Sequence, residues 1–217
     1  MENRPGEIRL AIIALLAWTG VILQFYLNTQ NWARLGLSAT EGTIRFFTYF
    51  TILTNILVAV SLTAVLIKPQ SRAGIFFSRD SPQAAIAVYI FVVGLVYNLI
   101  LRKLWAPQGL QLIVDNILHS AVPLLYVLFW VVFVSKKNLV WIDAVRWLAY
   151  PAVYFLWVII FGALTSFYPY PFIDVNVLGY PTMFLHAGVL LVVFVMLAIL
   201  VIAIGRFAGS KASANNV

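Results

Sequence analysis

Six long apolar runs dominate the sequence and decide what the chain can fold into. Each run has at least about 18 residues, enough to cross a bilayer as an α-helix. The sequence therefore predicts an all-α integral membrane protein, organised as a single six-helix transmembrane domain over residues 1–217. The expected spans lie at about residues 10–27, 45–67, 84–101, 111–134, 142–164 and 182–204.

The composition supports the membrane interpretation and excludes several classes of function. Apolar residues make up 63% of the chain and charged residues 10%, whereas a soluble domain has far fewer apolar residues. The chain has no cysteine, which excludes a disulfide framework, a thiolate metal site and a cysteine nucleophile. Its net charge of +7 comes from residues in the connections rather than from one patch, so nucleic-acid binding is not expected. No cofactor is expected either.

The lysines and arginines also predict an orientation, because cytoplasmic connections of membrane proteins carry an excess of them. The two terminal tails and the second–third and fourth–fifth connections hold Arg4, Arg9, Lys68, Arg72, Arg79, Lys136, Lys137, Arg146, Arg206 and Lys211. The opposite connections hold Arg34, Arg45, Arg102 and Lys103. We therefore expect both termini to be cytoplasmic. No small-residue cleavage site follows the first run, which predicts a retained span and not a signal peptide.

The fourth run combines an acid, a histidine and a proline within two helical turns. Asp115 and His119 are four residues apart and therefore share one helix face. Ionisable groups at membrane depth are costly, which makes them candidates for a functional site. Pro123 has no N–H, so it leaves the carbonyl of His119 without its helical donor and bends the chain. The sequence predicts a kinked helix that holds a free carbonyl beside a carboxyl–imidazole pair.

The second run carries a stripe of polar side chains. Thr48, Thr51 and Asn55 recur at helical spacing on one face, with Thr54 beside them. Threonines in membrane helices often bond back to their own backbone or join helices together, and that alternative stays open for each of them. Counted along the helices, Thr51, Asn98, His119 and His186 all fall in the outer halves of their spans. They predict one polar pocket that opens toward the non-cytoplasmic side.

A hydroxyl, an imidazole and a carboxylate at one depth are the groups of a nucleophile, a general base and an orienting residue. In this hypothesis His119 takes the proton of Thr51 as it attacks an acyl carbon, and Asp115 holds the ring. Candidate donors to the oxyanion are Asn55, Asn98 and Asn116. Side chains expected to bind substrate are Thr48, Thr54, Asn55, Asn98, Asn116, Tyr126, Trp157 and His186.

Other classes of function remain open on the residues alone. A lipid-binding protein without catalysis, or a proton-linked transporter that uses Asp115 and His119 as a relay, fits the same polar residues. The chain has no repeated halves and no matching pair of broken helices, which argues against transport. Zinc bound by Asp115, His119 and His186 lacks a short-range ligand pair, so no metal site is expected.

Two segments resemble the paired motifs of the androgen-induced membrane hydrolases. The segment 49–53 matches their Tyr-x-Thr motif, and the segment 115–120 is similar to their Asn-His-x-x-His-Thr motif. The whole chain resembles bacterial six-span relatives of these enzymes, including Trp157 and the loop 168–174. The resemblance implies hydrolysis of fatty-acid esters of hydroxy fatty acids within a membrane, here the bacterial inner membrane. It puts the base on His119 and the nucleophile on Thr51, with Thr48 as the alternative.

Overall fold

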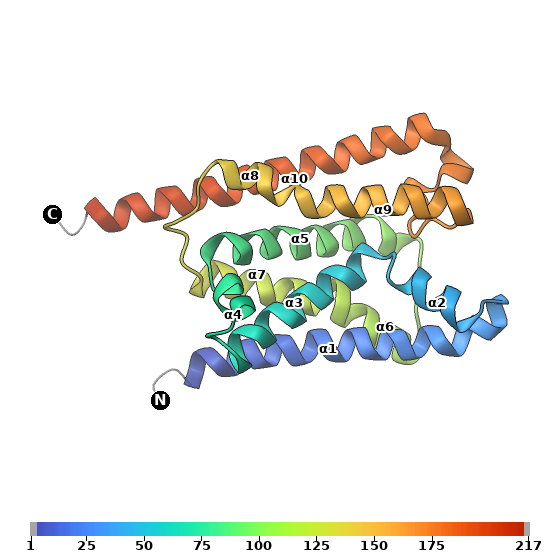
Figure 1. Cartoon of the computed structure of the whole chain (residues 1–217), viewed down its shortest axis with the longest axis horizontal. Helices are drawn as coiled ribbons and strands as arrows, with labels where there is room; N and C mark the ends of the chain where they lie inside the picture. The colour runs from blue at the N-terminus through green and yellow to red at the C-terminus, as the bar shows by residue number, and fades with distance from the viewer. Residues whose placement is uncertain (1–3, 215–217) are drawn as a thin grey trace. The chain divides into compact units, whose positions relative to one another are not determined.

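The computed structural model describes residues 4–214, and the regular elements among them are all helical (Figure 1). Six helices or series of helices are long and apolar enough to cross a membrane. They are Gly6–Leu35, Phe50–Ile67, Asp80–Lys103, Gly109–Phe133, Ile142–Thr165 and Val175–Arg206. The prediction of an all-α multi-pass membrane protein is thereby supported.

The elements in chain order are α1 (Arg4–Trp32), η1 (Ala33–Leu35), α2 (Ala39–Phe46), α3 (Phe50–Ile67), α4 (Arg72–Phe77), α5 (Asp80–Leu99), η2 (Leu101–Lys103), α6 (Gly109–Asn116), η3 (Ile117–Ala121), α7 (Val122–Phe133), α8 (Ile142–Trp147), α9 (Ala149–Thr165), η4 (Pro171–Ile173) and α10 (Val175–Ala214). The chain divides into two compact units, residues 1–134 and 135–217. A single domain over residues 1–217 was expected from the six apolar runs.

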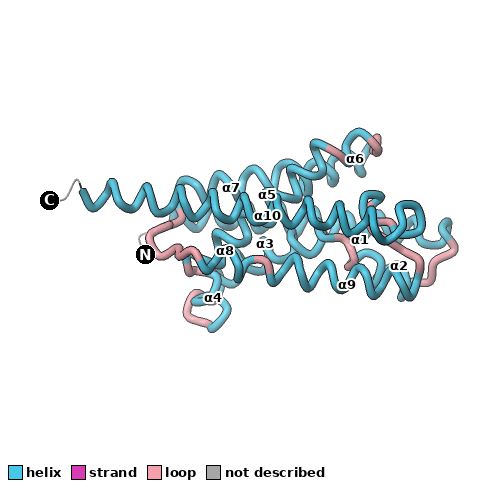
Figure 2. The backbone as a smooth tube through the Cα atoms, turned by 90° about the horizontal axis from the view of Figure 1, so that it is seen from above, coloured by secondary structure: helices cyan, strands magenta, loops and turns pink. Residues whose placement is uncertain are grey.

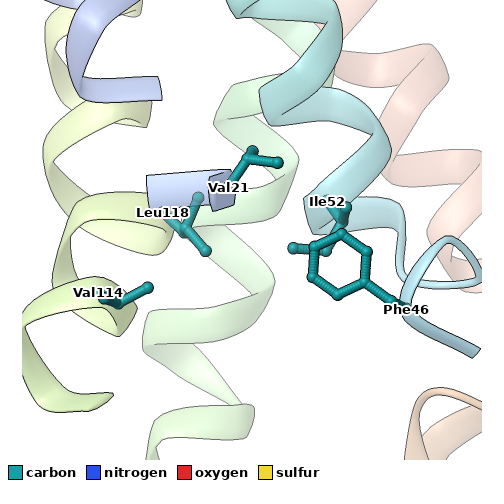
Figure 3. Packing of buried hydrophobic residues seen from close by; sticks show 5 residues of the cluster. All are labelled: Val21, Phe46, Ile52, Val114 and Leu118. Atoms are coloured by element: carbon teal, nitrogen blue, oxygen red, sulfur yellow. The ribbon is translucent and has the colours of Figure 1, made fainter. Parts of the chain in front are cut away.

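In the first unit the spans pack side by side as a bundle (Figures 1 and 2). Helix α1 contacts α3, α6 and α7, while α5 contacts α3 on one side and α7 on the other. One buried cluster lies where α1, α3 and the α6–η3 segment meet, and it comprises Val21, Phe46, Ile52, Val114 and Leu118 (Figure 3). Lipid tails are as apolar as these side chains, so close packing rather than the hydrophobic effect holds such helices together.

The second unit contains α8, α9, η4 and α10, and its own cluster is centred on Val158, Ile173 and Met183. Tyr168 packs flat against Gly162, where an added Cβ would lie only 2.1 Å from the tyrosine ring. The loop that follows α9 is therefore held against that helix by an aromatic ring in place of a side chain.

Prolines also lie beside interruptions of the fifth and sixth spans. The fifth span is interrupted at Leu148, between α8 and α9, and Pro151 lies in the first turn of α9. Helix α10 is interrupted at Gly179, whose φ of 70° only glycine adopts readily, and Pro181 lies in the first turn after this break. Helix α10 continues to Ala214, and residues 215–217 lie outside the described part.

The expected start of the second span near residue 45 was wrong, and the connection before it is not simply a loop. Helix α2 fills much of that connection and ends at Phe46, before α3 begins at Phe50. Ser38 caps α2 by accepting a bond from the N–H of Glu41, and Arg45 pairs with Glu41 at 2.6 Å. These local interactions stabilise a separate short helix, which apolar content alone does not reveal.

We expect Gly20→Leu to destabilise the first unit. A Cβ added to Gly20 would lie 2.8 Å from Leu118 Cδ2, so a leucine must push α1 away from η3. The cost should be about 1–3 kcal/mol in equilibrium unfolding in detergent micelles. The control is Gly188→Leu on α10, where an added Cβ meets nothing within 4 Å. Equal destabilisation by both variants would contradict this packing.

Candidate functional site

The candidate site is built around a break in the fourth span. Its middle turn, η3, is π-helical, and the N–H of Val122 bonds to the carbonyl at the start of η3. The carbonyl of Leu118 is therefore passed over by the donor that an α-helix would supply. Pro123 has no N–H for the carbonyl of His119. The predicted kink is confirmed, and it deprives two successive carbonyls of their α-helical donors.

Two asparagines on neighbouring helices take these carbonyls. Asn55 Nδ2 on α3 donates to the carbonyl of Leu118 at 3.2 Å, and Asn98 Nδ2 on α5 donates to the carbonyl of His119 at 3.1 Å. A carbonyl without a donor at membrane depth costs free energy, so each amide stabilises a helix contact that the kink requires. The first of these bonds shows that the second and fourth spans pack together, as a site shared by Thr51 and His119 requires.

Each amide also bonds to its own helix, which makes the arrangement rigid. Asn55 Nδ2 donates to the carbonyl of Thr51 at 2.9 Å, and Asn98 Nδ2 donates to that of Gly94 at 2.8 Å. Gly94 lets α5 approach closely, because a Cβ there would lie 3.1 Å from Pro123 Cβ. The amide N–H groups are thus committed to backbone carbonyls. This corrects the expectation that Asn55 and Asn98 stand ready to donate to an oxyanion.

Asp115 and His119 form the expected pair, and a tyrosine joins them. Asp115 is 4% exposed, and its Oδ1 lies 3.3 Å from His119 Nδ1. Its Oδ2 accepts a hydrogen bond from the hydroxyl of Tyr97 on α5. The rings of Tyr97 and His119 stack with their centroids 3.8 Å apart and their planes inclined by 17°. The imidazole is therefore positioned by a carboxylate on its own helix and by an aromatic face on the next.

The contacts of His119 decide which ring nitrogen carries the proton. Nδ1 lies 2.9 Å from the backbone carbonyl of Asp115, and a carbonyl oxygen can only accept. Nδ1 is therefore the donor in the neutral ring, and Nε2 is left with its lone pair. The His119 side chain is 15% exposed, so the ring is not sealed in the bundle. This is the form of histidine that acts as a general base.

The backbone of Thr51 on α3 is linked to the backbone next to His119 through the amide of Asn55. Thr51 is 7% exposed, and the Asn55 amide that donates to its backbone carbonyl also donates to the carbonyl of Leu118, the neighbour of His119. Thr54 is fully buried on the same helix. Thr48 lies in the break before α3, and its hydroxyl donates to the carbonyl of Arg45 at 2.5 Å. For Thr48 the backbone-bonding alternative is what the structure contains.

Sequence reasoning missed Tyr97 and Arg102 as site residues. Arg102 Nη1 donates to Asn98 Oδ1 at 2.9 Å, and its Nη2 donates to Asn116 Oδ1 at 3.0 Å. Ser120 Oγ lies 3.5 Å from the same Asn98 oxygen. Tyr97 directly precedes Asn98, and Arg102 follows it by four residues, on the same helix face. These positions next to a polar residue at membrane depth were the signal that could have identified them. Arg102 was counted only as a topological charge.

Three other expected substrate residues make contacts within their own units. Tyr126 is fully buried on α7, against Phe129. In the second unit, Trp157 stacks on Phe161 with centroids 5.5 Å apart, and His186 Nδ1 lies 2.7 Å from the carbonyl of Phe172. These contacts are packing and backbone interactions. A role in binding substrate stays a prediction for all three.

We expect Asn98→Ala to cost about 0.5–2 kcal/mol in equilibrium unfolding in micelles, because the carbonyl of His119 loses its donor. Pro123→Ala restores an N–H for that carbonyl, so the loss from Asn98→Ala should shrink in the Pro123→Ala background. Asn31→Ala is the control, since this exposed asparagine bonds only to Leu27 of its own helix. If the changes in unfolding free energy for Asn98→Ala and Pro123→Ala simply add, the Asn98 amide does not replace the donor that Pro123 removes from the carbonyl of His119.

Among the described residues no three His, Cys, Asp or Glu side chains gather as metal ligands would. Comparison with protein-family models, with curated proteins and with solved structures finds no match.

Proposed function

We propose that this protein is an intramembrane hydrolase of lipid esters in which His119 is the general base. The observation that supports this most strongly is the fixed imidazole: Nδ1 is bound to Asp115, the ring lies against Tyr97, and Nε2 is the accepting nitrogen. A histidine oriented by a buried carboxylate is the arrangement that removes a proton from a hydroxyl nucleophile in acyl transfer.

Thr51 is the proposed nucleophile. It lies in the first turn of α3, and the amide of Asn55 ties its carbonyl to that of Leu118, beside His119. In the reaction, His119 Nε2 takes the proton from Thr51 Oγ1 as this oxygen attacks the ester carbonyl carbon. The C–O bond to the leaving alcohol breaks, and the imidazolium returns the proton to that alcohol. Water then cleaves the acyl–threonine bond by the same proton transfers in the second half of the cycle.

Asp115 has a defined part in both halves of this cycle. Its carboxylate faces the Nδ1 side of the ring, where it stabilises the imidazolium that forms when Nε2 takes a proton. Tyr97 donates to the other carboxylate oxygen and so fixes the rotation of the carboxyl group. The proposed substrates are fatty-acid esters of hydroxy fatty acids or similar lipids. The proposed setting is the bacterial inner membrane, with both termini inside and the pocket open to the outside.

A second candidate function follows from the bond between Tyr97 and Asp115. This bond extends the Asp115–His119 pair into a chain of three proton-carrying groups that crosses from α5 to the fourth span. Such chains serve proton-linked transporters, in which intramembrane acids and histidines pass protons. In the hydrolase Tyr97 positions a carboxyl group, whereas in the transporter its hydroxyl carries the proton.

If the protein is a threonine hydrolase, a phosphonate probe of the serine-hydrolase type should label the purified chain covalently. Labelling should vanish in Thr51→Ala, because the hydroxyl that forms the adduct is gone. His119→Ala should slow it by about 10²–10⁴-fold, the usual contribution of a general base. Thr63→Ala, also on α3 but bonded to Ala59 and Trp18, is the matched control and should label like wild type. Unchanged labelling in both Thr51→Ala and His119→Ala would end the covalent mechanism, and loss in Thr48→Ala alone would move the nucleophile to Thr48.

Tyr97→Phe separates the two candidate functions. Phenylalanine keeps the stack on His119 and removes only the hydroxyl that donates to Asp115. We expect the hydrolase to keep at least about a tenth of its labelling rate, since one positioning bond contributes about 1 kcal/mol. A proton-linked carrier should instead lose proton uptake in liposomes under an imposed pH gradient. Proton flux in wild type that disappears in Tyr97→Phe, without probe labelling in either, would establish the transporter.

A further inference from the structure

Arg102 is held in one position by two neutral side chains. Its Nη1 donates to Asn98 Oδ1 on α5 and its Nη2 donates to Asn116 Oδ1 on α6, so the guanidinium bridges two helices. The asparagines are themselves fixed, because Asn98 Nδ2 is bonded to Gly94 and His119 and Asn116 Nδ2 donates to the carbonyl of Leu112 at 2.9 Å. An exposed arginine side chain is normally free to move, and here its orientation is set in advance.

The charge of this guanidinium has no acidic partner among the described residues. Glu41, Asp115 and Asp143 form ion pairs there with Arg45, His119 and Arg146, and none of these pairs involves Arg102. A guanidinium has five N–H donors, and two of them go to the amide oxygens. The other donors and the full positive charge remain for a ligand. A planar, oriented guanidinium favours carboxylate and phosphate oxygens.

Exposed apolar side chains flank Arg102 in the sequence, together with the exposed Lys103. Leu99 is 59% exposed, Leu104 67%, Trp105 53% and Ile113 57%, and all four lie in the segments that flank the arginine. A tryptophan and a cation among exposed apolar side chains are typical of the boundary between lipid tails and headgroups. A ligand that satisfies both features carries an oxyanion at one end and an acyl chain at the other.

We propose that Arg102, held in place by Asn98 and Asn116, binds the oxyanion of a lipid, a carboxylate or a phosphate, whose acyl chain lies along Leu99, Leu104 and Trp105. The site adjoins the candidate catalytic centre, since Asn98 bonds to both Arg102 and the carbonyl of His119. Binding here does not depend on the proposed hydrolysis. It needs only the fixed cation and the apolar surface beside it.

The test measures binding by the purified full chain in neutral maltoside micelles, by native mass spectrometry. Oleate and dioleoyl phosphatidate are titrated against their uncharged counterparts, oleyl alcohol and dioleoylglycerol. At least one anionic lipid should bind about tenfold or more tightly than its counterpart. Oleate alone identifies a carboxylate site, phosphatidate alone identifies a phosphate site, and both together identify a general oxyanion site. Equal binding of charged and uncharged lipids overturns the proposal.

Two variants and one control assign the binding to this cluster. Arg102→Gln should weaken anionic binding about tenfold by removing the charge. Asn116→Asp should weaken it to the same extent, because a carboxylate against Arg102 neutralises the charge of the guanidinium. This variant keeps the arginine paired, so it tests the proposal even if Arg102→Gln folds poorly. Arg34→Gln removes an exposed arginine from η1, at the same end of the first unit, and should change binding less than about twofold (Figure 1). Equal weakening by Arg34→Gln and Arg102→Gln would show only general attraction between charges.

Discussion

Two hydrogen bonds from asparagine amides to backbone carbonyls of the fourth span fix how the helices of the first unit pack. Pro123 and the π-helical turn before it deprive Leu118 and His119 of their usual helical donors, and lipid offers no water as a substitute. Asn55 and Asn98 supply the bonds from α3 and α5. Each bond is worth only about 1 kcal/mol, yet together they fix the register of two helices against the fourth span. In an isolated helix this interruption would leave two carbonyls without donors, whereas here the same carbonyls hold α3 and α5 against the fourth span.

The same attachment positions the candidate chemistry. Tyr97 precedes Asn98, so the turn of α5 that holds the His119 carbonyl also brings a phenol to Asp115 and an aromatic face to the imidazole. The oxygen of the Asn98 amide holds Arg102. One side chain therefore links the helix contact, the orientation of the histidine and the exposed cation. The imidazole is positioned by backbone and side-chain bonds that do not require a ligand to be present.

Much of this was predictable because it depends on local covalent chemistry. The pairing of Asp115 with His119 follows from four-residue spacing on a helix, and the open carbonyl follows from the missing N–H of Pro123. The start of the second span at Arg45 was wrong because α2 ends at Phe46 and the chain turns before α3, where the Thr48 hydroxyl donates to the carbonyl of Arg45. The donor role expected for Asn55 was wrong for another reason: its amide serves a carbonyl 63 residues away, and no local pattern reports such a partner.

The sequence by itself determined that this is an all-α membrane protein with six apolar spans, where its helices bend, and that an acid and a histidine share one face. These properties depend on run length, proline chemistry and helical spacing, which act over a few residues. Only the tertiary structure decided that Tyr97 stacks on His119, that Asn55 and Asn98 take the two carbonyls, and that Arg102 is held between two amides. These pairings depend on which helix faces which and at what register. Packing between segments distant in the sequence decides these pairings, and helical periodicity within one segment does not predict them.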